Sequence, residues 1–165
     1  MRRNCAALAV VLLCAGIVPA MAAAPPLSAA DQAAAFKAAG FKQRGKAWHS
    51  SCEDPGTASY VPGEIEPVGD LNGDGRPDAL ITESSTYCYG DAGTAFWLVS
   101  KQANGRWTLM ANETGMATFL AGKGAGGWPD IEVGGPGFCF PVVRWDGRQY
   151  RPHGHQYDGK PCTPG

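Results

Sequence analysis

Beyond Gly40, short apolar runs alternate with turn-forming residues, and this pattern restricts the chain to a β-rich fold. Most of the 23 glycines and 13 prolines, and all five tryptophans, lie in this part. Glycine and proline favour turns, whereas Val, Ile, Thr and the aromatic residues between them favour strands. We expect a β region over about residues 46–157, with strands at six places: Ala79 to Thr82, Ala95 to Ser100, Arg106 to Met110, Asp130 to Val133, Val142 to Trp145 and Gln149 to Arg151.

Two dipeptides, Asn104-Gly105 and Asp146-Gly147, predict tight hairpins between neighbouring strands. A type I′ turn needs positive φ at both central residues, which Asn, Asp and Gly tolerate best. Strands joined by such a short turn run antiparallel. The turns therefore favour an antiparallel sheet.

A loose internal repeat lies within the β region. The segment Pro77–Ile81 resembles Pro129–Val133, and each is followed by a cysteine, an apolar strand, a glycine turn and an aromatic residue. The cysteine is Cys88 in the first copy and Cys139 in the second, at nearly the same spacing. Two meander units of one sheet, or two blade-like sheets, would give this spacing, and chance similarity is the alternative. The predicted fold class is mainly β: a small antiparallel domain of two loosely repeated units.

One helix is predicted before the β region. Ser28 is a suitable N-cap, and Gly40 is placed where a glycine commonly ends a helix. We expect the helix over about residues 28–39. Its apolar residues Leu27 and Phe36 would pack against one face or end of a sheet.

Residues 1–22 have the pattern of a secretory signal peptide. Arg2 and Arg3 precede an apolar run over 6–18, and small residues follow. That run is shorter than the roughly 18 to 20 apolar residues that span a bilayer as a helix. Cleavage would leave one β-rich domain over residues 23–165, periplasmic or secreted, with no membrane span.

The net charge argues against nucleic acid as a partner. Loss of Arg2 and Arg3 takes the formal net charge from −1 to about −3. Proteins that bind nucleic acid need clustered Lys and Arg to neutralise phosphates. We therefore expect no nucleic-acid partner.

The even number of cysteines beyond residue 22 predicts two disulfides. An oxidising compartment pairs cysteines in exported proteins. If the strands alternate in direction, the four residues could gather at one end of the sheet, which leaves all three pairings possible. Of these, we favour Cys52–Cys88 with Cys139–Cys162.

The motif with the clearest chemistry is a nine-residue loop over 70–78 that is rich in Asp, Asn and Gly. Its polar residues recur at alternate positions, and Gly75 stands at position 6, where the chain must turn sharply. Carboxylate, amide and backbone carbonyl oxygens are the hard ligands that Ca²⁺ prefers. The candidate calcium ligands are Asp70, Asn72, Asp74, the backbone carbonyl of Arg76, and Asp78.

An EF-hand would need a bidentate Glu at position 12 of this loop, but Ile81 is there. The segment over about 68–82 resembles instead the calcium-binding loop of FG-GAP and VCBS-type repeats of integrin-like propellers. The resemblance implies calcium ligation by the residues named above and a loop that joins two antiparallel strands. A propeller needs at least about four blades, so we expect an isolated domain. The alternative is a turn rich in Asp and Asn that binds no metal.

Several weaker patterns have two interpretations each. His153 and His155 could begin a copper or zinc site, but a solvated C-terminal segment is the simpler interpretation. The aromatic residues around Cys88 and Cys139 could form a stacking surface for sugar or peptide, or pack in the core. The segment Gly122–Gly127 is interpreted as a flexible connection.

Three functions from different classes follow from these patterns. The first is a non-catalytic binding module for a protein or carbohydrate, in which Ca²⁺ clamps a β-hairpin loop. The second is a purely structural envelope or secreted protein. The third is a small extracytoplasmic hydrolase, which would need a deep pocket around Glu83, Glu132 or His153. The sequence favours the first, because it identifies no catalytic residue.

Overall fold

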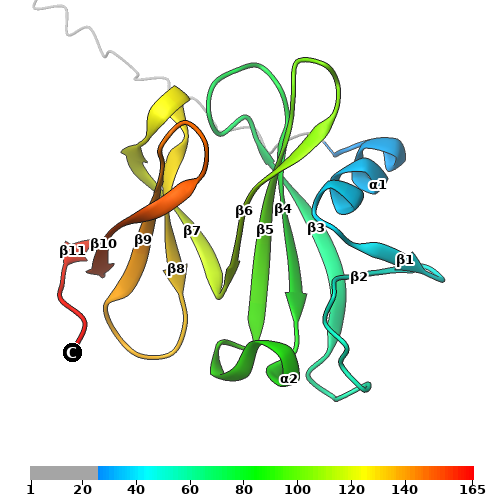
Figure 1. Ribbon diagram of the computed structural model, residues 1–165, viewed down its shortest axis with the longest axis horizontal. Helices are drawn as coiled ribbons and strands as arrows, with labels where there is room; N and C mark the ends of the chain where they lie inside the picture. Colours follow the sequence, from blue (N-terminus) through cyan, green and yellow to red (C-terminus); the bar gives the residue numbers. More distant parts are fainter. Residues whose placement is uncertain (1–25) are drawn as a thin grey trace, which may run out of the picture.

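The computed structural model describes residues 26–165 and shows two antiparallel sheets, one N-terminal helix and one short second helix (Figure 1). The predicted signal peptide, 1–22, lies outside the described residues. The helices are α1 (Ala29–Ala38) and α2 (Thr86–Tyr89), with the 3₁₀ turns η1 (Gly90–Ala92) and η2 (Ala125–Gly127). The strands are β1 (Lys42–Arg44), β2 (Ala47–His49), β3 (Val61–Gly69), β4 (Asp78–Ser84), β5 (Thr94–Lys101), β6 (Trp107–Thr114), β7 (Met116–Lys123), β8 (Pro129–Gly134), β9 (Phe140–Trp145), β10 (Tyr150–Tyr157) and β11 (Lys160–Pro161).

Both sheets are curled meanders in which each strand pairs with its neighbour in the chain. The first sheet has the order β1-β2-β3-β4-β5-β6 and the second has the order β11-β10-β9-β8-β7. This confirms the predicted antiparallel β fold with two units, and the units are two sheets rather than parts of one. The repeated segments hold equivalent places, because β4 and β8 are each flanked by two strands within their own sheet.

The two predicted hairpins are present, but their turns are not of type I′. They join β5 to β6 and β9 to β10. Gly105 has φ of 78° and Gly147 has φ of 103°, whereas Asn104 and Asp146 do not have positive φ. The side chains of these two residues instead accept backbone N–H groups that follow in the loop. This local capping fixes them in a right-handed turn before the glycine.

Strands β3 and β7 were not predicted, nor were the short strands β1, β2 and β11, and the segment Gly122–Gly127 is not a flexible connection. Gly122 and Lys123 end β7, and η2 follows. Prolines and exposed glutamates interrupt β3, and small residues dilute β7, so neither has a dense run of β-branched residues. Their pairing partners supply the order that local sequence does not.

Helix α1 forms as predicted and covers one face of the first sheet. The Ser28 side chain accepts the Asp31 N–H at 3.1 Å, and Gly40, with φ of 86°, ends the helix. The Phe36 ring stacks on Trp48 with centroids 4.9 Å apart. The Asp31 carboxylate also forms a salt bridge with Lys101 Nζ of β5, which joins the first turn of the helix to the sheet.

The core has two layers, one on each face of the first sheet. One lies between α1 and the sheet and includes Phe36, Ile81 and Trp97. The other lies between the two sheets, where Phe96 and Leu98 meet side chains of the second sheet. Strands β4 and β5 are thus buried on both faces, which explains the near-continuous apolar run of β5.

A single glycine links the sheets. Gly115 stands between the last residue of β6 and the first of β7, with φ of 131°. A Cβ atom there would lie 2.3 Å from the backbone oxygen of Gly134. Only glycine allows this corner, because both the backbone angle and the close approach exclude a side chain.

The two disulfides are Cys52–Cys88 and Cys139–Cys162, which confirms the favoured pairing. Their Cα separations of 5.9 and 5.6 Å are ordinary for disulfides. The first bond ties the β2–β3 connection to α2, and the second ties the β8–β9 connection to the C-terminal segment. Over residues 26–165, no helix is long and apolar enough to cross a membrane.

Candidate functional site

The predicted calcium loop joins β3 to β4, which are antiparallel neighbours. Four of the five candidate ligands lie in the loop, and the fifth, Asp78, is the first residue of β4. Gly73 and Gly75 have φ of 79° and 80°, so the loop uses the left-handed conformation that glycine permits. The structure therefore places the candidate residues on one tight turn between two strands.

Asp70 organises the first half of the loop. Its Oδ1 accepts the N–H of Gly73 at 2.8 Å and of Asp74 at 3.0 Å, and its Oδ2 accepts the N–H of Gly75 at 2.7 Å. These bonds curl the chain around the carboxylate. An ionised carboxylate has about four lone-pair positions, so Asp70 retains acceptor capacity for a cation.

Asp74 is paired with a cation that the loop itself supplies. Its carboxylate forms a salt bridge with the Arg76 guanidinium and accepts the Asn72 amide at 3.0 Å. The Arg76 side chain also donates from Nε to the Lys101 carbonyl at 3.0 Å, which anchors it to the end of β5. The sequence suggested a role for the Arg76 carbonyl only, and the side chain adds positive charge to the loop.

Asp78 is the most unusual of the five residues, because its side chain is fully buried. Its Oδ2 accepts the Leu71 N–H at 2.8 Å, whereas its Oδ1 has no hydrogen-bond partner within residues 26–165. Burial raises the pKa of Asp78 to about 6. The negative charges of Asp74 and Asp70 add to this, and the Leu71 N–H opposes it. The Ser100 Oγ, on the facing residue of β5, is likewise buried without a hydrogen bond.

The loop also touches the second sheet. Lys123 Nζ, at the end of β7, donates to the Leu71 carbonyl at 3.1 Å. A Cβ atom at Gly127 would lie 2.6 Å from the Asn72 carbonyl oxygen. The Leu71 side chain packs against the core between the sheets. The loop thus stands at the junction of the two halves of the fold.

The acids of the loop are near one another but do not converge on one point. Within the part of the chain that the structure describes, no group of three or more His, Cys, Asp or Glu side chains is arranged to hold a metal ion. The Asp74 carboxylate is instead paired with the Arg76 guanidinium. Convergence would require Asp74 to exchange the guanidinium for another cation.

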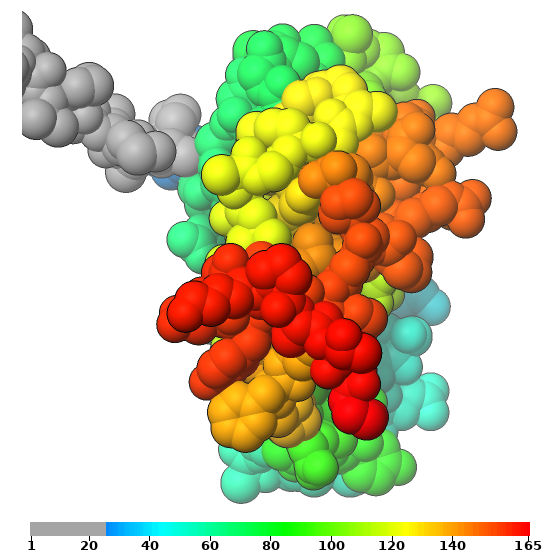
Figure 2. Space-filling view, turned by 90° about the vertical axis from the view of Figure 1, so that its left-hand side faces the viewer, coloured from blue at the N-terminus to red at the C-terminus, as the bar shows by residue number. Residues whose placement is uncertain are grey.

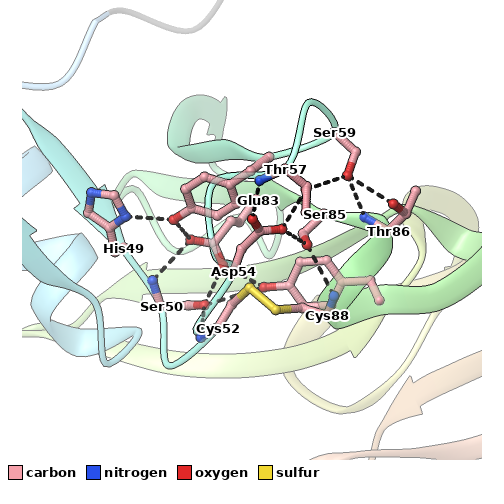
Figure 3. The surroundings of a disulfide bond; sticks show 12 residues. His49, Ser50, Cys52, Asp54, Thr57, Ser59, Glu83, Ser85, Thr86 and Cys88 are labelled. Atoms are coloured by element: carbon pink, nitrogen blue, oxygen red, sulfur yellow. Dashed lines mark hydrogen bonds between the residues drawn. A yellow bond between two sulfur atoms is a disulfide. The ribbon is translucent and has the colours of Figure 1, made fainter.

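Sequence analysis missed the hydrogen-bond network around Glu83, which lies beside the Cys52–Cys88 disulfide (Figure 3). Glu83 is 1% exposed, near the end of β4. Its carboxylate accepts the Ser50 N–H at 3.1 Å and the Tyr60 hydroxyl at 3.0 Å. The hydroxyls of Ser50 and Tyr89 donate to its other oxygen. Every acceptor position of this buried acid is therefore occupied.

Two further groups extend the network. Because the Tyr60 hydroxyl donates to Glu83, its oxygen accepts from His49 Nδ1 at 2.6 Å, which fixes the proton on that nitrogen. Burial and the charge of Glu83 raise the pKa of Tyr60 to about 12. On the other side, Asp54 accepts the Ser85 hydroxyl at 2.6 Å and two backbone N–H groups.

The Glu83 network has a structural role. It fastens the strand-free connection between β2 and β3 to the end of β4, together with the nearby disulfide. A saturated carboxylate has no open position for a substrate proton. Of the residues named for a hydrolase, Glu83 lies in the first sheet, whereas Glu132 and His153 lie in the second.

The chain matches no protein-family model, no curated protein and no solved structure. The resemblance to calcium-binding propeller loops therefore depends on the residues of the loop alone. Any function must be argued from the chemistry of the described residues.

Proposed function

We propose that this chain is a calcium-stabilised binding module that works outside the cytoplasm. One observation carries the proposal: a fully buried aspartate, Asp78, has a carboxylate oxygen without a partner beside two further acids of the same loop. An unpaired buried carboxylate is costly unless a cation or a hydrogen bond compensates it. A divalent cation between Asp78, Asp70 and Asp74 would provide that compensation.

The proposed donor set suits Ca²⁺ in its chemistry. It has three carboxylates, the Asn72 amide oxygen and the Arg76 carbonyl, all hard oxygen donors. We expect the ion to replace the Arg76 guanidinium beside Asp74. The guanidinium would keep its hydrogen bond to the Lys101 carbonyl at the end of β5. Calcium bound there would fix the β3–β4 hairpin and its contacts with Lys123 and Gly127.

The compartment is proposed from the cysteines and the first residues. Two disulfides persist in oxidising surroundings and are rare in the cytosol. The pattern of residues 1–22 is that of an export signal. Extracellular calcium sites commonly have Kd values of about 10⁻⁴ to 10⁻³ M, which suits a compartment with millimolar calcium.

Thermal unfolding in EDTA and in calcium tests the proposal. At about 5 mM calcium and a Kd in this range, binding should stabilise the fold by about 1–2 kcal/mol. The melting temperature should rise by roughly 3–10 °C. Magnesium should give a smaller rise, since it prefers a tight octahedron and retains its waters.

Three variants locate the effect. Asp74→Ala and Asp78→Asn should abolish the calcium-dependent rise, whereas Asp146→Ala, in the β9–β10 turn, should leave it intact. In EDTA, Asp78→Asn should melt no lower than the wild type, because the amide buries no charge. Equal melting temperatures of the wild type in EDTA and in calcium would contradict the site.

A further inference from the structure

A groove crosses the outer face of the second sheet, on the side away from the first sheet. The groove is about 550 Å³ in volume and lies on the face seen in Figure 2. Along β8, Ile131 and Val133 point to the core between the sheets, so the alternate residues Asp130 and Glu132 belong to the outer face.

Two glycines, which have no side chain, shape this groove. Gly122 of β7 and Gly154 of β10 both line it. A Cβ atom at Gly122 would lie 2.3 Å from Asp130 Oδ2, so a side chain there would have to displace the Asp130 carboxylate. At Gly154 the same atom would meet nothing within 4 Å, and that space is part of the groove. Leu120 and Val142 add an apolar lining.

Planar polar side chains lie in and beside the groove, and one of its two carboxylates is paired with a cation. Arg144 holds Asp130 through two hydrogen bonds of 2.7 and 2.6 Å. Gln156 donates to Glu132 at 2.7 Å, which leaves its amide oxygen free to accept. His153, displaced by an irregularity in the β9–β10 pairing, is exposed at the rim. Such a lining suits a ligand rich in hydroxyl groups more than a strongly charged one.

An aromatic cluster lies beside the groove, where β9 begins and β10 ends. It consists of Phe138, Phe140 and Tyr157, with the Tyr157 ring centroid 5.1 Å from that of Phe138 and 6.0 Å from that of Phe140. Phe140 pairs across the strands with Gln156, which lines the groove. Phe138 is 78% exposed, although the adjacent disulfide holds its segment in place. An exposed ring on a fixed segment is suited to stacking.

We propose that the groove and the aromatic cluster bind an uncharged oligosaccharide. The apolar faces of its sugar rings stack on Phe138 and Tyr157, and its hydroxyls bond to His153 and Gln156. This deepens the binding-module part of the proposed function, on which it rests, by assigning a ligand class. The calcium loop lies at the junction of the sheets rather than on this face, so the two sites can be tested separately.

The test is a titration of the disulfide-bonded protein with uncharged tetrasaccharides of glucose, N-acetylglucosamine, xylose and mannose. Calorimetry measures affinity, and amide NMR shifts locate binding. At least one tetrasaccharide should bind with a Kd at or below about 1 mM and shift the signals of β10 and of the 138–140 segment. If none of them binds, or if binding shifts other signals only, the proposal is wrong.

Two pairs of variants make the assignment specific. Phe138→Ala should weaken binding at least about tenfold, the usual consequence of losing a central aromatic contact. Tyr87→Ala removes an aromatic residue of similar exposure beside the other disulfide and should leave affinity unchanged. Gly154→Leu should fill the groove and abolish binding, whereas Gly154→Ala should keep most of it. Unchanged affinity in both Phe138→Ala and Gly154→Leu would overturn the proposal.

Measuring both properties in both variants distinguishes the calcium proposal from the oligosaccharide proposal. Asp74→Ala should keep oligosaccharide binding and lose the calcium-dependent rise in melting temperature. Phe138→Ala should keep that rise and lose oligosaccharide binding. Each proposal can therefore fail while the other stands.

Discussion

The pKa values of two aspartates in this fold, Asp54 and Asp78, are shifted in opposite directions. At Asp54, burial favours the neutral acid, but donors from Ser85, Thr57 and Gly56 outweigh it and lower the pKa to about 2. At Asp78, burial is larger than the effect of its donors and raises the pKa to about 6. The balance between burial and hydrogen-bond donors decides the direction, and two residues of the same type acquire different uses.

The lowered pKa of Asp54 predicts how the stability of the fold changes in acid. Its folded pKa is below the ordinary value of 3.8, so its contribution to stability is complete above about pH 4 and is lost as the pH falls towards 2. Wild type should therefore exceed Asp54→Asn in urea midpoint at pH 7, and this difference should shrink at pH 2.5. Tryptophan fluorescence during urea unfolding measures it.

Among the elements, the β6–β7 corner depends most on one residue. Gly115 combines a positive φ with a backbone contact that leaves no room for a Cβ atom. A side chain there would move β7 away from β8, and the core between the sheets would open. The corner is thus a local requirement with an effect on the packing of both sheets.

Gly115→Ala should lower the free energy of unfolding by at least about 2 kcal/mol, because strain and a steric clash act together. Urea unfolding gives this value directly. Gly135→Ala is the matched control, since a Cβ atom there meets nothing within 4 Å and the backbone angle is ordinary. An equal loss in the two variants would show that the corner tolerates a side chain.

The elements that sequence predicts well are those whose local signals agree with their surroundings. Strand β5 is dense in apolar residues because it is buried, β4 and β8 contain buried apolar residues, and Ser28 and Gly40 bound α1 through local bonds. Strands β3 and β7 lack such signals and are ordered by their partners. Turn type was mispredicted because side-chain capping at Asn104 and Asp146 competes with positive φ.

The 70–78 loop and the Glu83 network differ in the same way: local sequence signals predict the first and not the second. The spacing of the candidate ligands in the calcium loop is local, so the sequence could place them on one turn. The Glu83 network joins residues as far apart as Ser50 and Tyr89, which only strand pairing and a disulfide bring together. No local spacing in the sequence indicates it.

At the scale of the whole molecule, each disulfide is confined to one half. Cys52–Cys88 joins residues of the first sheet's connections, and Cys139–Cys162 joins residues of the second. No disulfide within residues 26–165 crosses between the halves. The halves are held together by the core between them, by the Gly115 corner and by the 70–78 loop.

Removing one disulfide should therefore loosen one half more than the other. The Cys52→Ala, Cys88→Ala double variant opens a 36-residue loop, and chain entropy predicts a loss of about 3–4 kcal/mol. Hydrogen exchange should quicken first in the 50–60 segment, with β8 to β10 less affected. The Cys139→Ala, Cys162→Ala variant should show the reverse. Equal quickening in both halves would mean that the sheets unfold as one unit.

The strictly sequential order of the strands has a consequence for biosynthesis. Because every strand pairs with a neighbour in the chain, the pairing contacts are short in sequence, and low contact order favours rapid folding. A chain that emerges N-terminus first can complete β1 to β6 before residue 115 is released. During that interval, the face of Phe96 and Leu98 is uncovered, so nascent chains should be most prone to aggregate just before the second sheet arrives.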